Sequence, residues 1–248
     1  MSKNKRSRVI PPDNRPKFKD VTPKVIVFDE KITKKYPEFR PNLTPKQMFE
    51  LGSFHDQGGY FRDIKSVHYK EMLEDTWKKY TKKGKCLEGI DKDLLVTPKT
   101  FKTKKSKIGL NKYKRKAGLS LKQWHEYGWM DKQDPYGWVQ WYCEFYDGRR
   151  SDRDDHQINR WIKFAGENSG RWNKNLMNKI INADTTYDDF KISPIIRQSL
   201  QHWAYQLTEE DLIKYEKSKS KISKKSKISK KSKISKKSKI SKKSKISK

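Results

Sequence analysis

The stretch DPYGWVQWYCEFYDGRRSDRDDHQINRW, residues 134–161, decides the fold of this chain. Asp134-Pro135 is a typical helix start, and Gly148 can supply the left-handed residue that ends a helix. Between them the sequence is apolar on nearly every side of a helix. Its clearest polar stripe consists of Gln140, Glu144 and Asp147. A helix of this kind is buried, so we predict a central helix over about residues 135–147.

Helix start signals recur on both sides of this stretch. Thr44-Pro45-Lys46-Gln47 and Ser120-Leu121-Lys122-Gln123 each place a hydroxyl at the N-cap and a Gln at N3, which is a capping box. A further helix begins at Ser151 or Asp152 and ends near Gly166. The last expected helices cover about 171–182, 193–206, and 208 into the C-terminal segment. The pattern predicts a mainly α fold with a single aromatic-rich helical domain over residues 44–216.

One segment has the pattern of a strand. It is KVIVF, residues 24–28, and prolines lie on both sides of it. We therefore expect residues 1–43 to form a basic, proline-containing and partly extended arm that lies on the domain rather than joining a sheet.

Tryptophan is concentrated around the central helix. Six of the eight Trp residues fall in this part of the chain: Trp124, Trp129, Trp138, Trp141, Trp161 and Trp172. Large aromatic side chains dominate burial energetics in a small domain, so an aromatic core is the main expectation. The alternative is that some of these rings are platforms on which nucleobases stack.

The formal net charge of +30 is distributed unevenly along the 248 residues. Residues 217–248 repeat the hexapeptide KSKISK and contain 16 Lys and no acidic residue. Their isoleucines recur every six residues, which matches no helical face, and the segment has too little apolar surface to fold. We expect a disordered Lys-rich tail that is either a nucleic-acid tether or a repeat expansion without a binding role.

A second basic cluster lies in a predicted loop of the domain, residues 99–116, with nine basic residues and no acid. Phosphate neutralisation by Lys and Arg is the usual basis of sequence-independent nucleic-acid binding. Arg149 and Arg150 are the other candidates, because Arg is scarce in this chain and its planar fork suits phosphate. The candidate contacts are therefore Lys104, Lys105, Lys107, Lys112, Lys114, Arg115, Lys116, Arg149 and Arg150.

Arg149 and Arg150 also have a structural interpretation. They could pair with Glu144, Asp147 or Asp152 and fix the turn between two helices. In that case they would not be available to a phosphate. Both interpretations stay open at the level of sequence.

Sequence motifs for catalysis or metal binding are weak. Asp152 and His156 share a helical face, but no HExxH or CxxC motif accompanies them. Gly58-Gly59 is not followed by the Lys-Ser/Thr pair of a phosphate-binding loop. The two cysteines, Cys86 and Cys143, are too few for a disulfide framework or a thiolate zinc site. We expect no catalytic residue, no metal and no cofactor.

The segments LTPKQMFELGSF, GGYFRDI, SGRW and the block 134–161 together resemble an uncharacterised protein family of fungi, algae and large DNA viruses. The resemblance covers about residues 44–176. The Lys, Ile and Ser bias and the hexapeptide tail resemble proteins of giant viruses of the Mimivirus type. Because the family has no assigned activity, the resemblance implies no catalytic residues.

Three functions follow as expectations. The first is a non-enzymatic protein that binds nucleic acid without sequence preference. The second is a structural or interaction module that binds a protein partner, and the third is an enzyme acting on a nucleic-acid or phosphorylated substrate. The N-terminal MSKNKRSRVIPP lacks the apolar stretch of a secretory signal, and no apolar run approaches the ~20 residues that span a bilayer. We expect an intracellular protein with no membrane contact, in the host cytoplasm or the virion if the chain is viral.

Overall fold

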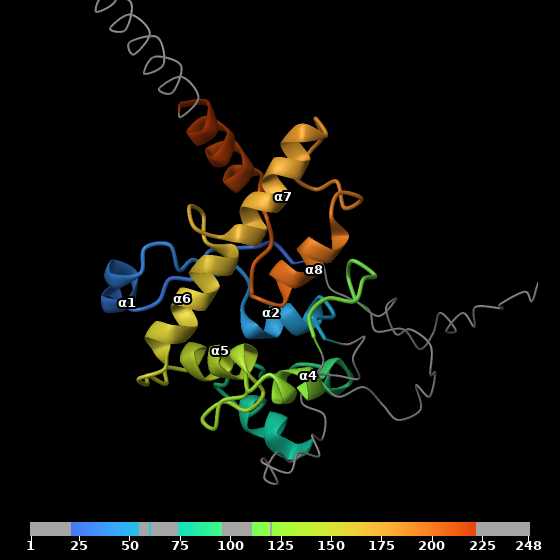
Figure 1. Ribbon diagram of the computed structural model, residues 1–248. Coiled ribbons are helices and arrows are strands. Elements are labelled where there is room, and N and C mark those ends of the chain that lie inside the picture. Colours follow the sequence, from blue (N-terminus) through green and yellow to red (C-terminus); the bar gives the residue numbers. More distant parts are fainter. Residues whose placement is uncertain (1–20, 55–59, 61–73, 96–110, 120, 222–248) are drawn as a thin grey trace, which may run out of the picture.

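The computed structural model describes residues 21–54, 60, 74–95, 111–119 and 121–221, and all regular structure within these ranges is helical (Figure 1). This confirms the mainly α fold. The helices are α1 (Glu30–Lys35), α2 (Pro45–Glu50), the 3-10 helix η3 (Glu74–Tyr80), α3 (Lys92–Leu95), α4 (Leu121–Glu126), α5 (Trp138–Tyr146), α6 (Asp154–Ala165), α7 (Arg171–Asn182), α8 (Pro194–Gln201) and a last helix over 209–221.

Helix α5 is the central helix, as predicted, and α2 and α6 pack against it. It begins at Trp138 rather than at Pro135, so the predicted start is wrong by three residues. The reason is Gly137, whose φ of +79° is left-handed and interrupts the helix before Trp138. The C-terminal end follows the prediction, because Gly148 has a φ of +97°.

The predicted polar stripe of α5 does not face solvent. Gln140 is buried, and its Oε1 accepts a hydrogen bond of 2.9 Å from the backbone N–H of Tyr136. Glu144 accepts a hydrogen bond of 2.9 Å from the Tyr80 hydroxyl and pairs with Lys79 at 2.5 Å. The stripe therefore holds η3 against α5.

The remaining helices follow one another around α5. In Figure 1, α6 and α7 run on from one another and α8 packs beside α7. Helix α7 has the predicted bounds, whereas α8 ends at Gln201 instead of near 206. The chain turns there because Ala204 has a φ of +53°, and its carbonyl accepts hydrogen bonds from the backbone N–H groups of Asn42 and Leu43.

The N-terminal arm lies on the domain, as expected, but it contains no strand within its described residues, 21–43. The backbone N–H groups of Lys24 and Ile26 donate to the carbonyls of Asn42 and Pro41 at 3.0 and 2.9 Å, so the arm doubles back on itself. Phe39 is buried with its ring centroid 5.3 Å from that of Trp161. This part of the arm belongs to the core.

The aromatic core is present around α5. Trp138, Trp141 and Trp161 are at most 2% exposed, which confirms their place in the core. Trp124 and Trp172 are half-buried. Trp129 is 57% exposed, so a core role for it is wrong. Its ring packs instead on the exposed Tyr127, with 5.0 Å between the ring centroids.

The C-terminal segment begins as a helix. Residues 217–221 continue the helix that starts at 209, which confirms the helix expected to run into this segment. The disorder predicted for 217–248 is therefore wrong at these five residues, and residues 222–248 lie outside the described ranges. Within those ranges, no helix combines the length and the apolar character that crossing a bilayer requires.

Candidate functional site

Arg149 is bound inside the protein. Its guanidinium makes two parallel hydrogen bonds, of 2.8 and 2.6 Å, to the carboxylate of Asp134, which is 1% exposed. Burial would lower the pKa of Arg149, but the bonds to Asp134 outweigh this effect and the pKa is raised. The pair fixes the turn between α5 and α6.

Arg150 is also bound to an acid. Its guanidinium pairs with Asp29 at 2.8 Å, donates to the Phe145 carbonyl at 2.9 Å and lies 4.0 Å from the centroid of the Phe145 ring. Asp29 is the N-cap residue of α1. The turn-fixing interpretation is therefore the one that the geometry supports, although the predicted partners Glu144, Asp147 and Asp152 are wrong: the partners are Asp134 and Asp29.

The basic loop is described only at its end. Lys104, Lys105 and Lys107 lie outside the described residues. The Nζ of Lys112 donates to Gln206 Oε1 at 3.1 Å. The side chains of Lys114, Arg115 and Lys116 are exposed, and the chain passes directly from them into the wall of a cavity.

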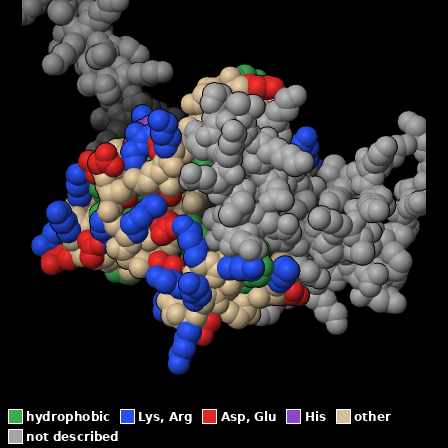
Figure 2. Space-filling model, turned by 90° about the horizontal axis from the view of Figure 1, so that it is seen from below, with side chains coloured by type: hydrophobic (Ala, Val, Ile, Leu, Met, Phe, Trp, Pro, Cys, Tyr) green, Lys and Arg blue, Asp and Glu red, His purple; other side chains and the backbone are tan. Residues whose placement is uncertain are grey.

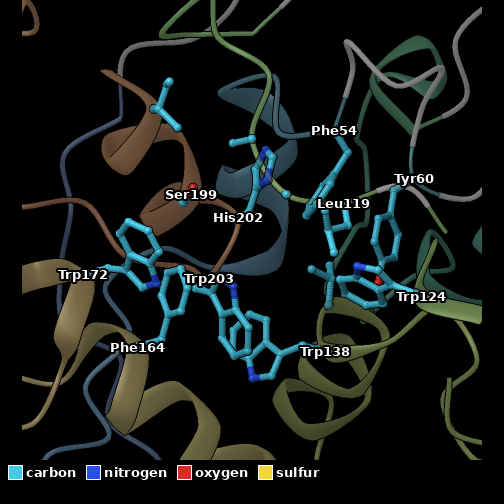
Figure 3. A pocket seen from close by; sticks show the side chains of 14 residues that line it. Phe54, Tyr60, Leu119, Trp124, Trp138, Phe164, Trp172, Ser199, His202 and Trp203 are labelled. Atoms are coloured by element: carbon cyan, nitrogen blue, oxygen red, sulfur yellow. The ribbon is translucent and has the colours of Figure 1, made fainter. Parts of the chain in front are cut away.

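This cavity has a volume of about 360 Å³ and is lined mainly by aromatic side chains (Figure 3). Volumes of this order are typical of small-molecule sites. We call it the aromatic cavity. Its described lining residues are Phe54, Tyr60, Ala117, Gly118, Leu119, Trp124, Trp138, Val139, Phe164, Trp172, Ile195, Ser199, His202 and Trp203.

A row of rings from three helices and the turn after α8 forms one wall. The ring centroids of Trp172 and Phe164 are 5.9 Å apart, those of Phe164 and Trp203 4.8 Å, and those of Trp203 and Trp138 4.9 Å. Figure 3 shows Phe54, Tyr60 and Trp124 on the other side. The row is assembled only by tertiary packing, since its members lie on α5, α6, α7 and the turn after α8.

The Trp124 ring of the cavity lining packs directly on Gly137. A Cβ at Gly137 would lie 2.4 Å from Cζ3 of Trp124, which is closer than atoms can approach. The same glycine also has the left-handed φ that ends the segment before α5. Only glycine satisfies both conditions at this position.

His202 makes the lining uncharged at neutral pH. Burial lowers its pKa to about 3. The Nε2 of Gln198 lies 2.9 Å from the Nε2 of His202, so in the neutral ring Nε2 accepts and Nδ1 carries the proton. The His202 ring stacks on Phe54 with 4.1 Å between the centroids. The described lining residues include no carboxylate, Lys or Arg.

A half-buried cation lies beside the cavity. The guanidinium of Arg160 is 5.3 Å from the centroid of the Trp203 ring and donates to Gln157 Oε1 at 2.9 Å. Burial lowers the pKa of Arg160. Unlike Arg149 and Arg150, it takes part in none of the ion pairs found within the described ranges.

Arg160 belongs to a row of basic residues on one face of α6. The row, which we call the basic stripe, consists of Arg153, His156, Arg160 and Lys163. Spacings of three and four residues place them on one side of the helix. Burial and the nearby Arg160 lower the pKa of His156. Arg153 pairs with Asp131, whereas Lys163 is exposed.

Arg160 is not among the phosphate contacts predicted from the sequence. The stripe was visible in the spacing, but the cavity beside it was not, because its residues lie between positions 54 and 203. Figure 2 shows one face of the molecule, on which basic and acidic side chains are interspersed without forming one unbroken basic patch.

Asp152 and His156 do not form a recognisable metal or catalytic centre. Asp152 is exposed, and the neighbouring Asp155 pairs with Lys35 at 2.8 Å. Within the described part of the chain, no group of three His, Cys, Asp or Glu side chains could hold a metal ion. Cys86 and Cys143 are both buried free thiols, and burial raises the pKa of Cys143.

No family model, curated protein or solved structure matches the chain. The resemblance to the fungal, algal and viral family therefore stays a prediction.

Proposed function

We propose that this protein binds nucleic acid without sequence preference, through phosphate contacts to Arg160 and the exposed cations around it. The observation that carries the proposal is the state of the Arg160 guanidinium. It is half-buried and has no carboxylate partner among the described residues, whereas Arg149 and Arg150 each have one. A desolvated cation without an acid is costly alone and is stabilised by an anionic ligand.

The charge of the whole chain favours the same class of ligand. A net charge of +30 attracts polyanions over distances beyond contact, and the attraction is screened by salt. The 13 lysines within residues 222–248 would add flexible phosphate contacts that carry no sequence information.

A salt series on the full chain tests the proposal. The binding constant for a single-stranded oligonucleotide should fall steeply with salt, and log K should change by about 0.7 per phosphate neutralised for each unit of log salt concentration. Arg160→Gln should flatten this slope by about one phosphate contact. Arg150→Gln is the matched control: it also removes one guanidinium charge, but it should leave the slope unchanged, because the Arg150 guanidinium is engaged by Asp29.

The tail is tested with a variant that ends at Lys221. Ending the chain at 216 would cut the last helix, in which Leu212 is buried and Lys219 donates to Asn178 at 2.7 Å. Loss of 222–248 should weaken binding nearly equally for unrelated sequences. If the full chain shows no binding at ~50 mM salt, where phosphate neutralisation is strong, the proposal is wrong.

One observation favours a protein partner as the second candidate function. Tyr127 and Trp129 form an exposed aromatic pair, 56% and 57% exposed. Exposed aromatic residues are enriched at protein interfaces. Absence of nucleic-acid binding would make this pair the leading candidate surface.

A further inference from the structure

We propose that the aromatic cavity receives an unpaired nucleobase, so that the protein prefers single-stranded nucleic acid to duplex. This inference rests on the proposed function, since the phosphate of the same nucleotide would contact Arg160. It goes beyond that function by naming the part of the ligand that enters the protein and the side chains that hold it.

The chemistry of the walls indicates a flat aromatic ligand. Seven of the fourteen described lining residues are Phe, Tyr or Trp, and stacking on such rings is favourable for every base. An acyl chain would instead be matched by a mainly aliphatic lining. The aliphatic side chains larger than Ala are only Leu119, Val139 and Ile195.

The charge of the surroundings excludes a cationic ligand. His202 is neutral, and the described lining contains no carboxylate that could balance a positive charge. The guanidinium of Arg160 lies over the Trp203 ring, 5.3 Å from its centroid. A cation in the cavity would be repelled by this guanidinium, whereas a neutral base joined to a phosphate would be attracted.

Two cations lie next to residues of the cavity lining. Arg160 contacts Trp203, which is in the row of rings, and the exposed Lys116 directly precedes Ala117, which is also in the lining. A nucleotide with its base in the cavity would therefore have basic groups within reach for its phosphates. This juxtaposition of a neutral aromatic cavity and cations is the arrangement that single-strand binding requires.

The preference for single strands follows from the need of the base to leave its neighbours before it can enter the cavity. A base in a duplex is paired and stacked, and it would have to be extruded at a cost of a few kcal/mol before it could enter. Sequence preference should stay weak, because the lining has few polar side chains. Besides Ser199, His202 and the indole N–H groups of its four tryptophans, it offers the Tyr60 hydroxyl, which already donates to the Tyr136 carbonyl.

The test compares two strands of equal length and equal charge, oligothymidylate and a strand of abasic sites, against the full chain. The abasic strand should bind about 5- to 150-fold more weakly, the fold-change that corresponds to stacking one base. Equal binding of both strands would overturn the cavity inference and leave the proposed function intact. Binding of neither strand at low salt would overturn the proposed function itself.

Two variants locate the base. Trp172→Leu removes one ring of the row from a half-buried position on α7, and Ser199→Phe fills the cavity from α8 without removing a ring. Each should abolish the difference between the two strands while leaving the affinity for the abasic strand unchanged. Thermal unfolding shows separately that each variant is folded, because the Lys-rich residues would bind the abasic strand in an unfolded chain as well. A full thymidylate advantage in folded Ser199→Phe would overturn the inference.

Trp129→Leu is the matched control. This tryptophan is exposed, lies outside the cavity lining and packs at a tilt on Tyr127. The substitution should leave the thymidylate advantage intact. If Trp129→Leu removes the advantage and Trp172→Leu does not, the base stacks on the exposed pair and the cavity inference is wrong.

Discussion

Trp138 and Trp141 should respond differently to replacement by Phe, although they lie three residues apart on the same helix. Both are at most 2% exposed. The indole N–H of Trp141 donates to Asp154 Oδ1 at 2.9 Å. The indole N–H of Trp138 is buried and has no hydrogen-bond acceptor among the described residues. The substitution removes the same atoms in both cases but removes a hydrogen bond in only one.

The difference between the two variants can be estimated from these contacts. Loss of the hydrogen bond to Asp154 should cost about 1.5–3 kcal/mol, the usual contribution of a bond to a charged group. Trp138→Phe loses no such bond and relieves an unsatisfied donor, so only the packing loss remains. The free energy of unfolding should therefore fall further in Trp141→Phe by about 1.5–3 kcal/mol. For a domain of this size that corresponds to a difference in Tm of roughly 3–12 °C.

Thermal unfolding of the full chain measures the effect, and urea unfolding gives the free energies independently. Trp138→Ala and Trp141→Ala serve as controls, because each should cost about 3–5 kcal/mol through cavity formation. The reasoning is refuted if Trp138→Phe lowers stability as much as Trp141→Phe does. That result would mean that the Trp138 indole N–H has a partner in solution.

Three further outcomes follow from the geometry. First, because burial lowers the pKa of His202 to about 3, the unfolded chain binds the proton more readily than the folded chain. The contribution of His202 to the free energy of unfolding should be complete above pH ~6.5 and fall by up to about 1.4 kcal/mol per pH unit as the pH drops towards 3. In urea unfolding, His202→Gln should weaken the dependence of the free energy of unfolding on pH between pH ~6.5 and ~4.5. Second, Asp134→Ala should lower the free energy of unfolding by about 3–5 kcal/mol because it leaves Arg149 without its buried partner. Asp29→Ala should cost less, about 1–2 kcal/mol, because it removes an exposed ion pair and the N-cap bond to the Ile32 backbone N–H; equal costs in chemical unfolding would contradict this ranking. Third, Gly137→Ala should lower the free energy of unfolding by at least about 1–2 kcal/mol for its left-handed φ alone. The added Cβ should also displace Trp124, which a change in tryptophan fluorescence would report. An unchanged spectrum and Tm would show that the fold does not require Trp124 to pack on Gly137.

Local signals predicted the helical elements well wherever capping chemistry was unambiguous. Thr44 caps α2 with Gln47 in a capping box, as expected. Helix α7 has the predicted bounds as well, although no side chain caps its N-terminus. The errors occur where tertiary contacts compete with a local signal. Asp134 was expected to start a helix, but its carboxylate binds Arg149 instead. The final turn of α8 is replaced by the contact between Ala204 and the arm.

The candidate site was less predictable than the fold for a related reason. Basic residues can be counted along the chain, but the acids that neutralise them cannot be assigned, because the partner of Arg150 lies 121 positions away at Asp29. The aromatic cavity is likewise built from residues that lie far apart in the sequence. Trp138 and Trp203 are 4.9 Å apart between ring centroids, yet the rest of α5 and all of α6, α7 and α8 lie between them in sequence.

Arg150 and Arg160 show why the pairing of a cation matters more than its presence. Each guanidinium lies on an aromatic ring, 4.0 Å from the centroid of Phe145 and 5.3 Å from that of Trp203. Asp29 completes the surroundings of Arg150, so this arginine contributes to stability. No described acid completes those of Arg160, and the ring beneath it lines a cavity. An anion that carries an aromatic group would neutralise Arg160 with its charge and fill the cavity with its ring. A nucleotide of an unpaired strand has both groups.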